Sequence, residues 1–343
     1  MKDKKPTRFL YLLALVLGIV LATSRIVLSR TALEKGIELY AHHTPLVTAM
    51  HIAILLCTVG LCLAGILLYL PEYIDVSAEE RRLEKEEAAR RKAEKAAQKR
   101  AYAALHAGEA LARRYEDKQE AARKERQRAQ KRYERECARM EKAFARPSLF
   151  VTFAGIFLGI MLILYAVMQL IGMAGNDFRE LAPLLGRAPL GKNSASSVLS
   201  LLHLISALPA AIYCFKAATT LGKPSAGFGI LASAPAIWSL LSTLILYFEM
   251  DVAFNSPTKL LRLSALVVFM LWQVQEGRML LGVPKRSLFA GFGSAATLLT
   301  LVCGISDLVL YAMGVITLGG GYIEAAVFVA LGMYAAARCL QNA

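Results

Sequence analysis

The chain has 343 residues, of which 56% are hydrophobic, and it carries a formal net charge of +14. Its mean hydropathy of +0.47 is far from that of an ordinary soluble domain, so the composition excludes that class. A helix of about 20 mostly apolar residues is long enough to cross the hydrocarbon of a bilayer. Eight runs of the chain reach this length, near residues 9–30, 46–70, 148–172, 197–219, 227–248, 260–281, 287–316 and 322–340.

Each of these runs is predicted to be a helix, because the hydrocarbon holds no water that could pair with free backbone amides. We therefore expect an all-α fold, that of a polytopic integral membrane protein with about eight transmembrane helices. The first and sixth runs fit this pattern least well. The first carries Arg25, and the sixth has four polar side chains close to one end, Gln273, Gln275, Glu276 and Arg278.

The first span also fits a secretory signal peptide. Lysines at positions 2, 4 and 5 precede its apolar core, and residues 22–24 are small, as a signal peptidase requires. The apolar run continues through residues 26–28, however, which extends it beyond that cleavage point. We favour an uncleaved helix, and both interpretations place residue 30 on the external side, so the topology of the later spans is the same.

Residues 77–146, between the second and third spans, have the opposite composition. They contain 22 Lys and Arg against 14 Asp and Glu, and with alanine these are strong helix formers. Ser77 and Glu80 match a helix-starting capping box, and Pro147 favours a stop. We therefore divide the chain into transmembrane helices 1 and 2 (1–76), a charged segment (77–146) and transmembrane helices 3–8 (147–343).

The charged segment has to return to the membrane, and this requirement limits its shape. One straight helix would be about 100 Å long, so it must lie along the bilayer surface or fold back. Gly108, near the middle, favours a turn, and we expect an antiparallel helical hairpin with a coiled-coil seam. The returning arm carries apolar side chains at 4-3-4 spacing, namely Tyr133, Cys137, Met140 and Phe144.

Three roles are open for this hairpin, whose mostly alanine seam would bury little area. The plainest is a solvated spacer, and the next is a docking site for a cytoplasmic protein. Attraction of the membrane-near Arg and Lys to anionic lipid headgroups is a third. Nucleic acid is not an expected partner, because the acidic residues interleave with the basic ones and would repel phosphate.

The orientation follows from the positive charge that flanks the membrane crossings. The basic flanks are Lys2, Lys4, Lys5, Arg8, Arg81, Arg82, Lys85, Arg135, Arg139, Lys142 and Arg146. With eight spans, both termini and the charged segment are predicted to be cytoplasmic, and we expect the plasma membrane as the location. Arg179, Arg187 and Lys192 would then lie outside, so a miscounted helix remains an alternative.

Several ionisable side chains fall within the predicted membrane helices, where charge is expensive and faces a bundle interior or a water-filled cavity. On the predicted topology Arg25, His51, His203 and Asp307 lie in the outer third of their spans, and Glu324 lies at an external end. A buried Asp307 stays ionised only beside a cation, and Arg25 or a protonated histidine can serve. We predict that these five residues form a binding site open to the outside. A purely structural ion-pair network is the alternative.

Charged side chains at the ends of spans need not all have a function. Glu249, Arg262 and Glu324 lie at external ends of spans, together with Asp251 and Asn255, and scatter near the membrane interface explains these three charges as well as a site does. A second group is interpreted as cytoplasmic anchors, namely Lys216, Arg278, Lys285, Arg286 and Arg338. Glu276 and Arg278 are two residues apart and point to different sides of a helix, so they are not expected to pair.

The sequence contains no recognisable catalytic or metal-binding motif. Six cysteines show neither a zinc spacing nor a disulfide framework, and we find no P-loop, dinucleotide-binding, HExxH or GxSxG pattern. His203 with Ser200 or Ser206 lies within one helix, which orients such a pair poorly for attack. We therefore expect no cofactor, no metal and no enzyme activity.

Two functions remain as hypotheses. The first is a non-enzymatic membrane anchor, sensor or scaffold whose cytoplasmic hairpin docks a partner or the membrane surface. The alternative is a small-solute transporter or permease with a polar site in the outer third of the bundle. The conspicuous charged segment and the lack of an internal repeat favour the first, whereas the outer-third charges favour the second.

Overall fold

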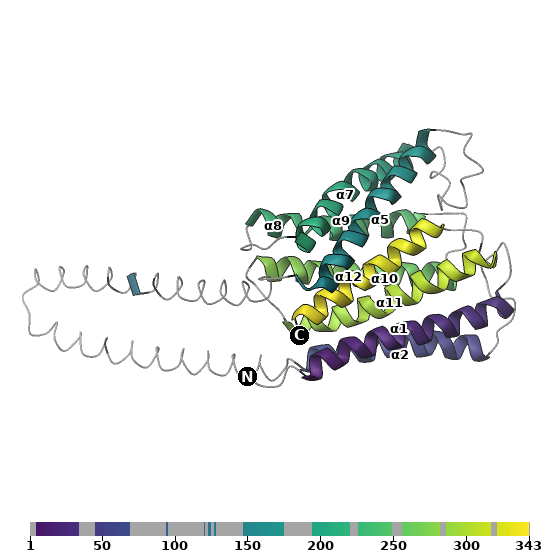
Figure 1. Ribbon diagram of the computed structural model, residues 1–343, viewed down its shortest axis with the longest axis horizontal. Coiled ribbons are helices and arrows are strands. Elements are labelled where there is room, and N and C mark those ends of the chain that lie inside the picture. The colour runs from purple at the N-terminus through teal and green to yellow at the C-terminus, as the bar shows by residue number, and fades with distance from the viewer. Residues whose placement is uncertain are drawn as a thin grey trace, which may run out of the picture. The chain divides into compact units, whose positions relative to one another are not determined.

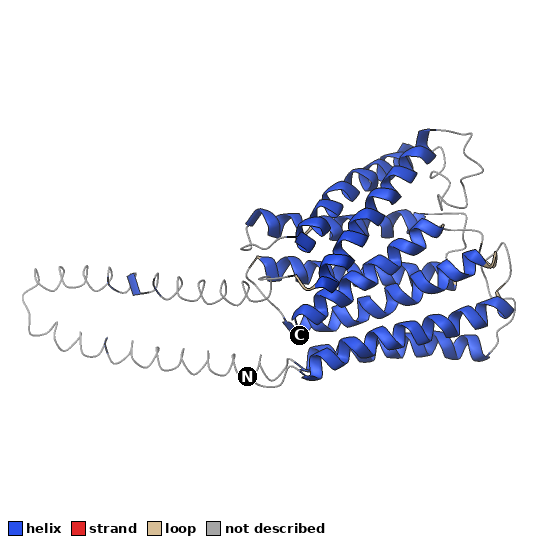
Figure 2. Ribbon diagram, viewed as in Figure 1, coloured by secondary structure: helices blue, strands red, loops and turns tan. Residues whose placement is uncertain are grey.

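The computed structural model describes residues 5–33, 45–68, 147–174, 194–219, 226–248, 256–281, 286–316 and 321–342, with five single residues between 94 and 127. Figure 2 shows that the regular structure of these residues is helical, with no strand among them. The helices are α1 (Lys5–Ala32), α2 (Pro45–Leu68), α5 (Leu149–Ala174), α7 (Ser194–Thr219), α8 (Ala226–Leu231), α9 (Ala234–Phe248), α10 (Pro257–Leu280), α11 (Arg286–Ala312) and α12 (Tyr322–Asn342).

Eight spans within the described ranges are long and apolar enough to cross a membrane, with α8 and α9 together forming one of them. The predicted all-α fold with eight membrane-length helices is therefore confirmed. The chain divides into two compact units, one of Met1–Leu68 with Met140–Ala343 and the other of Tyr69–Arg139. The first unit is the helix bundle.

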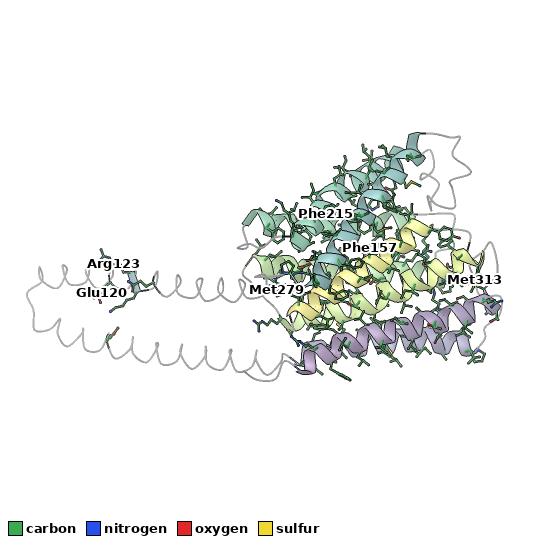
Figure 3. The ribbon with its side chains drawn as sticks, viewed as in Figure 1. Glu120, Arg123, Phe157, Phe215, Met279 and Met313 are labelled. Carbon is green, nitrogen blue, oxygen red and sulfur yellow. The ribbon has the colours of Figure 1, made fainter. Side chains whose placement is uncertain are left out.

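The predicted hairpin at 77–146, its turn at Gly108 and its seam lie almost wholly outside the described residues. Five residues of the segment are described, and all five are helical and exposed. The Lys124 ammonium lies 2.6 Å from the Glu120 carboxylate, one helical turn away, and this contact lowers the pKa of Glu120 (Figure 3). Such an exposed pair stabilises a helix only slightly and is typical of a solvated face.

The centre of the bundle is α11, which packs against α1, α2, α10 and α12 (Figure 1). A second group, α5, α7 and α9, joins this core through contacts of α5 with α12 and of α9 with α10. The most exposed span is α2, on which Leu55 and Leu56 are 62% and 64% exposed. An apolar face of this kind suits contact with lipid, since lipid tails are as apolar as leucine.

Close helix approach depends on glycine where α2 crosses α11. A Cβ atom added to Gly65 would lie 2.6 Å from the Gly291 Cα, so neither position has room for a side chain. One turn away the Ser294 hydroxyl lies 3.2 Å from the Leu61 carbonyl, within hydrogen-bond distance. Small residues therefore draw the two backbones together, as they do in other membrane helix pairs.

The fifth span is interrupted between α8 and α9. Pro235 has no N–H to donate to the carbonyl one turn earlier, and the helix breaks at residues 232–233. The Gln273 amide of α10 donates to the Ala232 carbonyl at 3.4 Å, and the Ser233 hydroxyl donates to the Ile230 carbonyl at 2.7 Å. The Ile230 carbonyl also accepts the Ser233 backbone N–H, so it is the Gln273 side chain that satisfies a backbone group left unpaired by the break.

Candidate functional site

Asp307, near the C-terminal end of α11, lies between two arginines from other helices. The Arg25 Nη1 of α1 is 2.7 Å from the Asp307 Oδ1, and the Arg262 Nε of α10 is 2.7 Å from the Oδ2. Each carboxylate oxygen therefore has its own guanidinium. All three side chains are buried, with 1–3% of each exposed.

Hydroxyl groups complete this cluster. The Arg25 guanidinium also donates to the Ser306 hydroxyl and, at 3.4 Å, to that of Thr258 on α10. Arg262 donates through Nη2 to the Tyr311 hydroxyl, at 3.2 Å. The cluster consequently ties α1, α10 and α11 together with charge-assisted hydrogen bonds, which are stronger than neutral ones.

The expected pairing of Arg25 with Asp307 is present in the structure. Burial of a lone carboxylate is prohibitively expensive, and close cations offset that penalty. The interpretation of Arg262 as an interfacial charge is wrong, since its side chain is buried and bonded to Asp307. The packing of α10 on α11 decides its position, because it brings the Arg262 side chain against Asp307.

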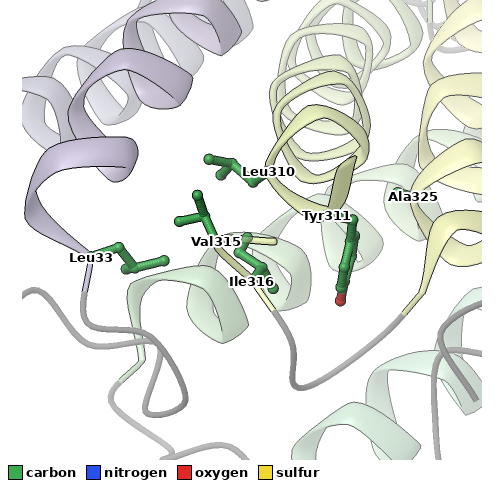
Figure 4. Close-up of a cluster of buried hydrophobic side chains, with 6 residues drawn as sticks. All are labelled: Leu33, Leu310, Tyr311, Val315, Ile316 and Ala325. Carbon is green, nitrogen blue, oxygen red and sulfur yellow. The ribbon is translucent and has the colours of Figure 1, made fainter. Parts of the chain in front are cut away.

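An apolar cluster covers the end of α11 immediately after Asp307 (Figure 4). Gly314, at a φ of +63°, ends the helix in the left-handed conformation that glycine adopts easily. The Gly314 and Val315 amides then bond back to the Tyr311 and Leu310 carbonyls, each at 2.9 Å. This turn folds the chain over the helix end, where the cluster comprises Leu33, Leu310, Tyr311, Val315, Ile316 and Ala325. The ion cluster is thus enclosed.

Two further predicted site residues lie near this cluster. Glu324, in the first turn of α12, is buried and adjoins Ala325, which belongs to the same apolar cluster as Tyr311. His51 of α2 is half-buried, lies within electrostatic range of Arg25, and bonds through Nδ1 to the carbonyl of Val47 at 2.8 Å. Both residues therefore belong to the surroundings of the Arg25–Asp307 pair.

His203 belongs to a different cluster. Its imidazole lies between the Gln169 amide of α5, at 3.2 Å, and the Ser242 hydroxyl of α9, at 2.7 Å. It also stacks on the Trp238 ring, with centroids 5.3 Å apart, and meets the Tyr165 ring edge-on. Since these partners come from α5 and α9, the structure divides the predicted site residues between two clusters.

A second buried ion pair, between Glu276 of α10 and Arg338 of α12, was not predicted. The Arg338 Nε lies 2.5 Å from the Glu276 Oε1, and the Tyr334 hydroxyl donates to the same carboxylate at 3.3 Å. The interpretation of Arg338 as a cytoplasmic anchor is wrong, because only 2% of it is exposed. The sequence did hold a signal for this pair, because Glu276 and Arg338 have opposite charges and lie at the same predicted depth of two spans.

Some predicted positions lie outside the described residues, so their contribution stays a prediction. These are Gly108, Glu249, Asp251, Asn255 and Lys285. Within the described ranges no three His, Cys, Asp or Glu side chains lie close enough together to hold a metal ion. No model of a protein family, no curated protein and no solved structure matches the chain.

Proposed function

We propose that the chain is a multi-pass anchor or scaffold of the plasma membrane. Its helix bundle would hold the charged segment, residues 77–146, at the cytoplasmic face. There the segment would dock a partner protein or the membrane surface. The observation that supports this role best is the enclosure of Asp307, whose two oxygens are each bonded to a buried arginine.

A closed ion cluster suits a bundle that holds its shape. Arg262 and Glu276 lie near opposite ends of α10, and their ion pairs fasten that helix to α11 and α12. Removing either partner of a buried pair is strongly destabilising, so both pairs resist separation of the helices. A frame of this kind can position an attached segment without moving, and the role requires no catalysis.

In this proposal the charged segment, residues 77–146, is the part of the chain that binds the partner or the membrane surface. Its basic excess would favour acidic protein surfaces and anionic headgroups on the cytoplasmic side. Placement of both termini and the segment in the cytoplasm follows from the positive flanks of the crossings. Its interleaved acidic residues disfavour nucleic acid as a partner.

The alternative is a small-solute transporter or permease with a polar site in the outer third of the bundle. One observation favours it: Arg25, Arg262 and Asp307 bring charged groups of both signs together inside the bundle. If this cluster opened to water, those groups could bind a small polar solute. The two proposals therefore differ in whether water reaches the cluster.

Water access can be measured with cysteines beside the cluster. In a variant without the native cysteines, Thr258→Cys and Ser306→Cys would each be treated from outside with a membrane-impermeant thiol reagent. Met313→Cys, exposed at the end of α11, is the matched control. The anchor predicts rapid labelling at 313 and none at 258 or 306. Rapid labelling at the two buried positions would contradict it and support the transporter, and labelling at 313 only from the cytoplasm would contradict the predicted topology.

The docking role needs its own test. Residues 80–145 would be replaced by a short flexible linker, and both forms would be cross-linked in intact membranes. The anchor predicts that cross-linked partners disappear while the thermal stability of the bundle is unchanged. An identical set of partners in both forms would show that the charged segment does no docking.

A further inference from the structure

The His203 cluster contains the parts of an activated serine. Ser242, His203 and Gln169 come from three helices, α9, α7 and α5, and form a continuous line of hydrogen bonds. Serine alcohols become nucleophiles when a base lies within hydrogen-bond reach and a third group orients that base. From the sequence, only Ser200 and Ser206 were considered as partners of His203, and both lie in the same helix as this histidine. In the bundle a third serine, Ser242, reaches His203 from another helix.

The hydrogen bonds of this line indicate which nitrogen of His203 carries the proton, and they leave the other free to act as a base. The Gln169 Nε2 donates to the Tyr165 hydroxyl at 3.0 Å, which turns the Oε1 toward His203. The His203 Nδ1, 3.2 Å from that oxygen, must then carry the proton. The Nε2 is left as an acceptor, 2.7 Å from the Ser242 hydroxyl. This neutral tautomer is the one that can remove the serine proton.

Two donors beside Ser242 lack a partner in the described part of the bundle. They are the Trp238 Nε1 and the Ser239 hydroxyl, from residues that are 3% and 0% exposed. Buried polar groups are nearly always hydrogen-bonded, so each of these donors calls for an acceptor. The Trp238 ring stacks directly on His203. An oxygen bearing negative charge, such as that of a reacting carbonyl, would satisfy these donors.

The surface next to this cluster is apolar and exposed. Gln169 is half-buried, its neighbour Leu170 is 54% exposed, and on α7 Leu202 and Ile205 flank His203 with 49% and 55% exposed. In a membrane such side chains face lipid. Ser242 itself is buried, so a molecule that reached it would come from lipid, past the half-buried Gln169, and would carry an apolar chain.

We propose that Ser242 is a nucleophile, with His203 as its general base and Gln169 as a positioning residue, that reacts with esters of apolar acyl chains. The Ser242 oxygen would bond to the ester carbonyl carbon as its proton passes to the His203 Nε2. The ester C–O bond would then break, and the departing alcohol would take that proton. Water would later hydrolyse the acyl-serine through the same base, releasing the carboxylic acid. This reactivity goes beyond the anchoring role.

A purely structural arrangement makes a different prediction. The Ser242 hydroxyl also lies 2.9 Å from the Trp238 carbonyl, to which it can donate its single proton within the helix. In that case His203 would not raise the reactivity of Ser242. The two cases separate by reaction with fluorophosphonates, in which the serine oxygen displaces fluoride from phosphorus and stays covalently bound.

The experiment treats the full chain, in lipid nanodiscs, with diisopropyl fluorophosphate and with a long-chain alkyl fluorophosphonate. Peptide mapping by mass spectrometry should find the adduct on Ser242, formed faster by the long-chain probe. Ser242→Ala should abolish it, and His203→Asn should slow it about a hundredfold. The matched control, Ser206→Ala, removes a hydroxyl that bonds only the His203 carbonyl and should leave the rate unchanged.

Gln169 tests the positioning role separately. Gln169→Leu should slow labelling in protein that still folds, and Gln169→Glu, which keeps an acceptor for the Nδ1 proton, should restore the rate. Absence of an adduct on Ser242 with both probes would overturn the proposal. So would an unchanged rate in a folded His203→Asn or Gln169→Leu protein, because a serine that reacts alone needs no base.

Discussion

Replacing Asp307 with asparagine tests the ion cluster most directly. The substitution keeps the size of the side chain and removes its charge. Arg25 and Arg262 then remain buried without the carboxylate that binds both of them. Replacing either arginine is a milder change, because the other guanidinium still pairs with Asp307.

The magnitudes follow from this geometry. Leaving a charge buried after removal of its partner destabilises a protein by about 3–5 kcal/mol, so Asp307→Asn should lower the unfolding free energy by about that amount. Arg25→Met or Arg262→Met removes a charge-assisted hydrogen bond but keeps a one-to-one pair, which we expect to lower it by about 1.5–3 kcal/mol. Replacing all three residues with apolar ones of similar volume should recover most of the loss.

The assay is equilibrium unfolding in mixed micelles, followed by circular dichroism. The matched control is Ser264→Ala, on the exposed face of α10, where the hydroxyl bonds only within its own helix. We expect no measurable change from this control. The reasoning would be refuted if Asp307→Asn behaved like the control, or if either arginine substitution destabilised the bundle more than Asp307→Asn.

Two further predictions concern helix contacts. Glu276→Gln should lower the unfolding free energy of the bundle by about 3–5 kcal/mol in the same assay, because Arg338 would stay buried without this carboxylate. Adding Arg338→Met should recover most of that loss. Equal stability of the single and double variants would contradict the pairing. Gly65→Ala should cost about 1–3 kcal/mol, because the added Cβ would meet the Gly291 backbone at 2.6 Å, whereas Gly60→Ala, with no atom within 4 Å, should be neutral. Equal melting temperatures of the two glycine variants would show that α2 does not cross α11 closely.

The sequence predicted the transmembrane helices well, because the requirement that determines them is local. A run of about 20 apolar residues must bond its own backbone in lipid, and composition alone reveals such a run. Even the break in the fifth span has a local cause in Pro235, although its second support, the Gln273 side chain, comes from another helix.

The sequence also predicted that Asp307 has either Arg25 or a protonated histidine as its partner, because a buried carboxylate needs a cation, and the structure shows Arg25 in that place. It did not distinguish Arg262 from an interfacial charge. Residues at one depth are distributed around a helix, and only the rotation of α10 against α11 decides which of them is buried. Arg338 was assigned to the surface for the same reason.

The grouping of His203 shows this limit most clearly. Depth placed it with Asp307, yet the packing of α5, α7 and α9 surrounds it with Gln169 and Ser242. Local sequence therefore determined which segments are helices and which side chains are costly to bury. Tertiary structure alone decided which of those side chains meet, because neighbouring helices are chosen by complementary shapes along their whole length.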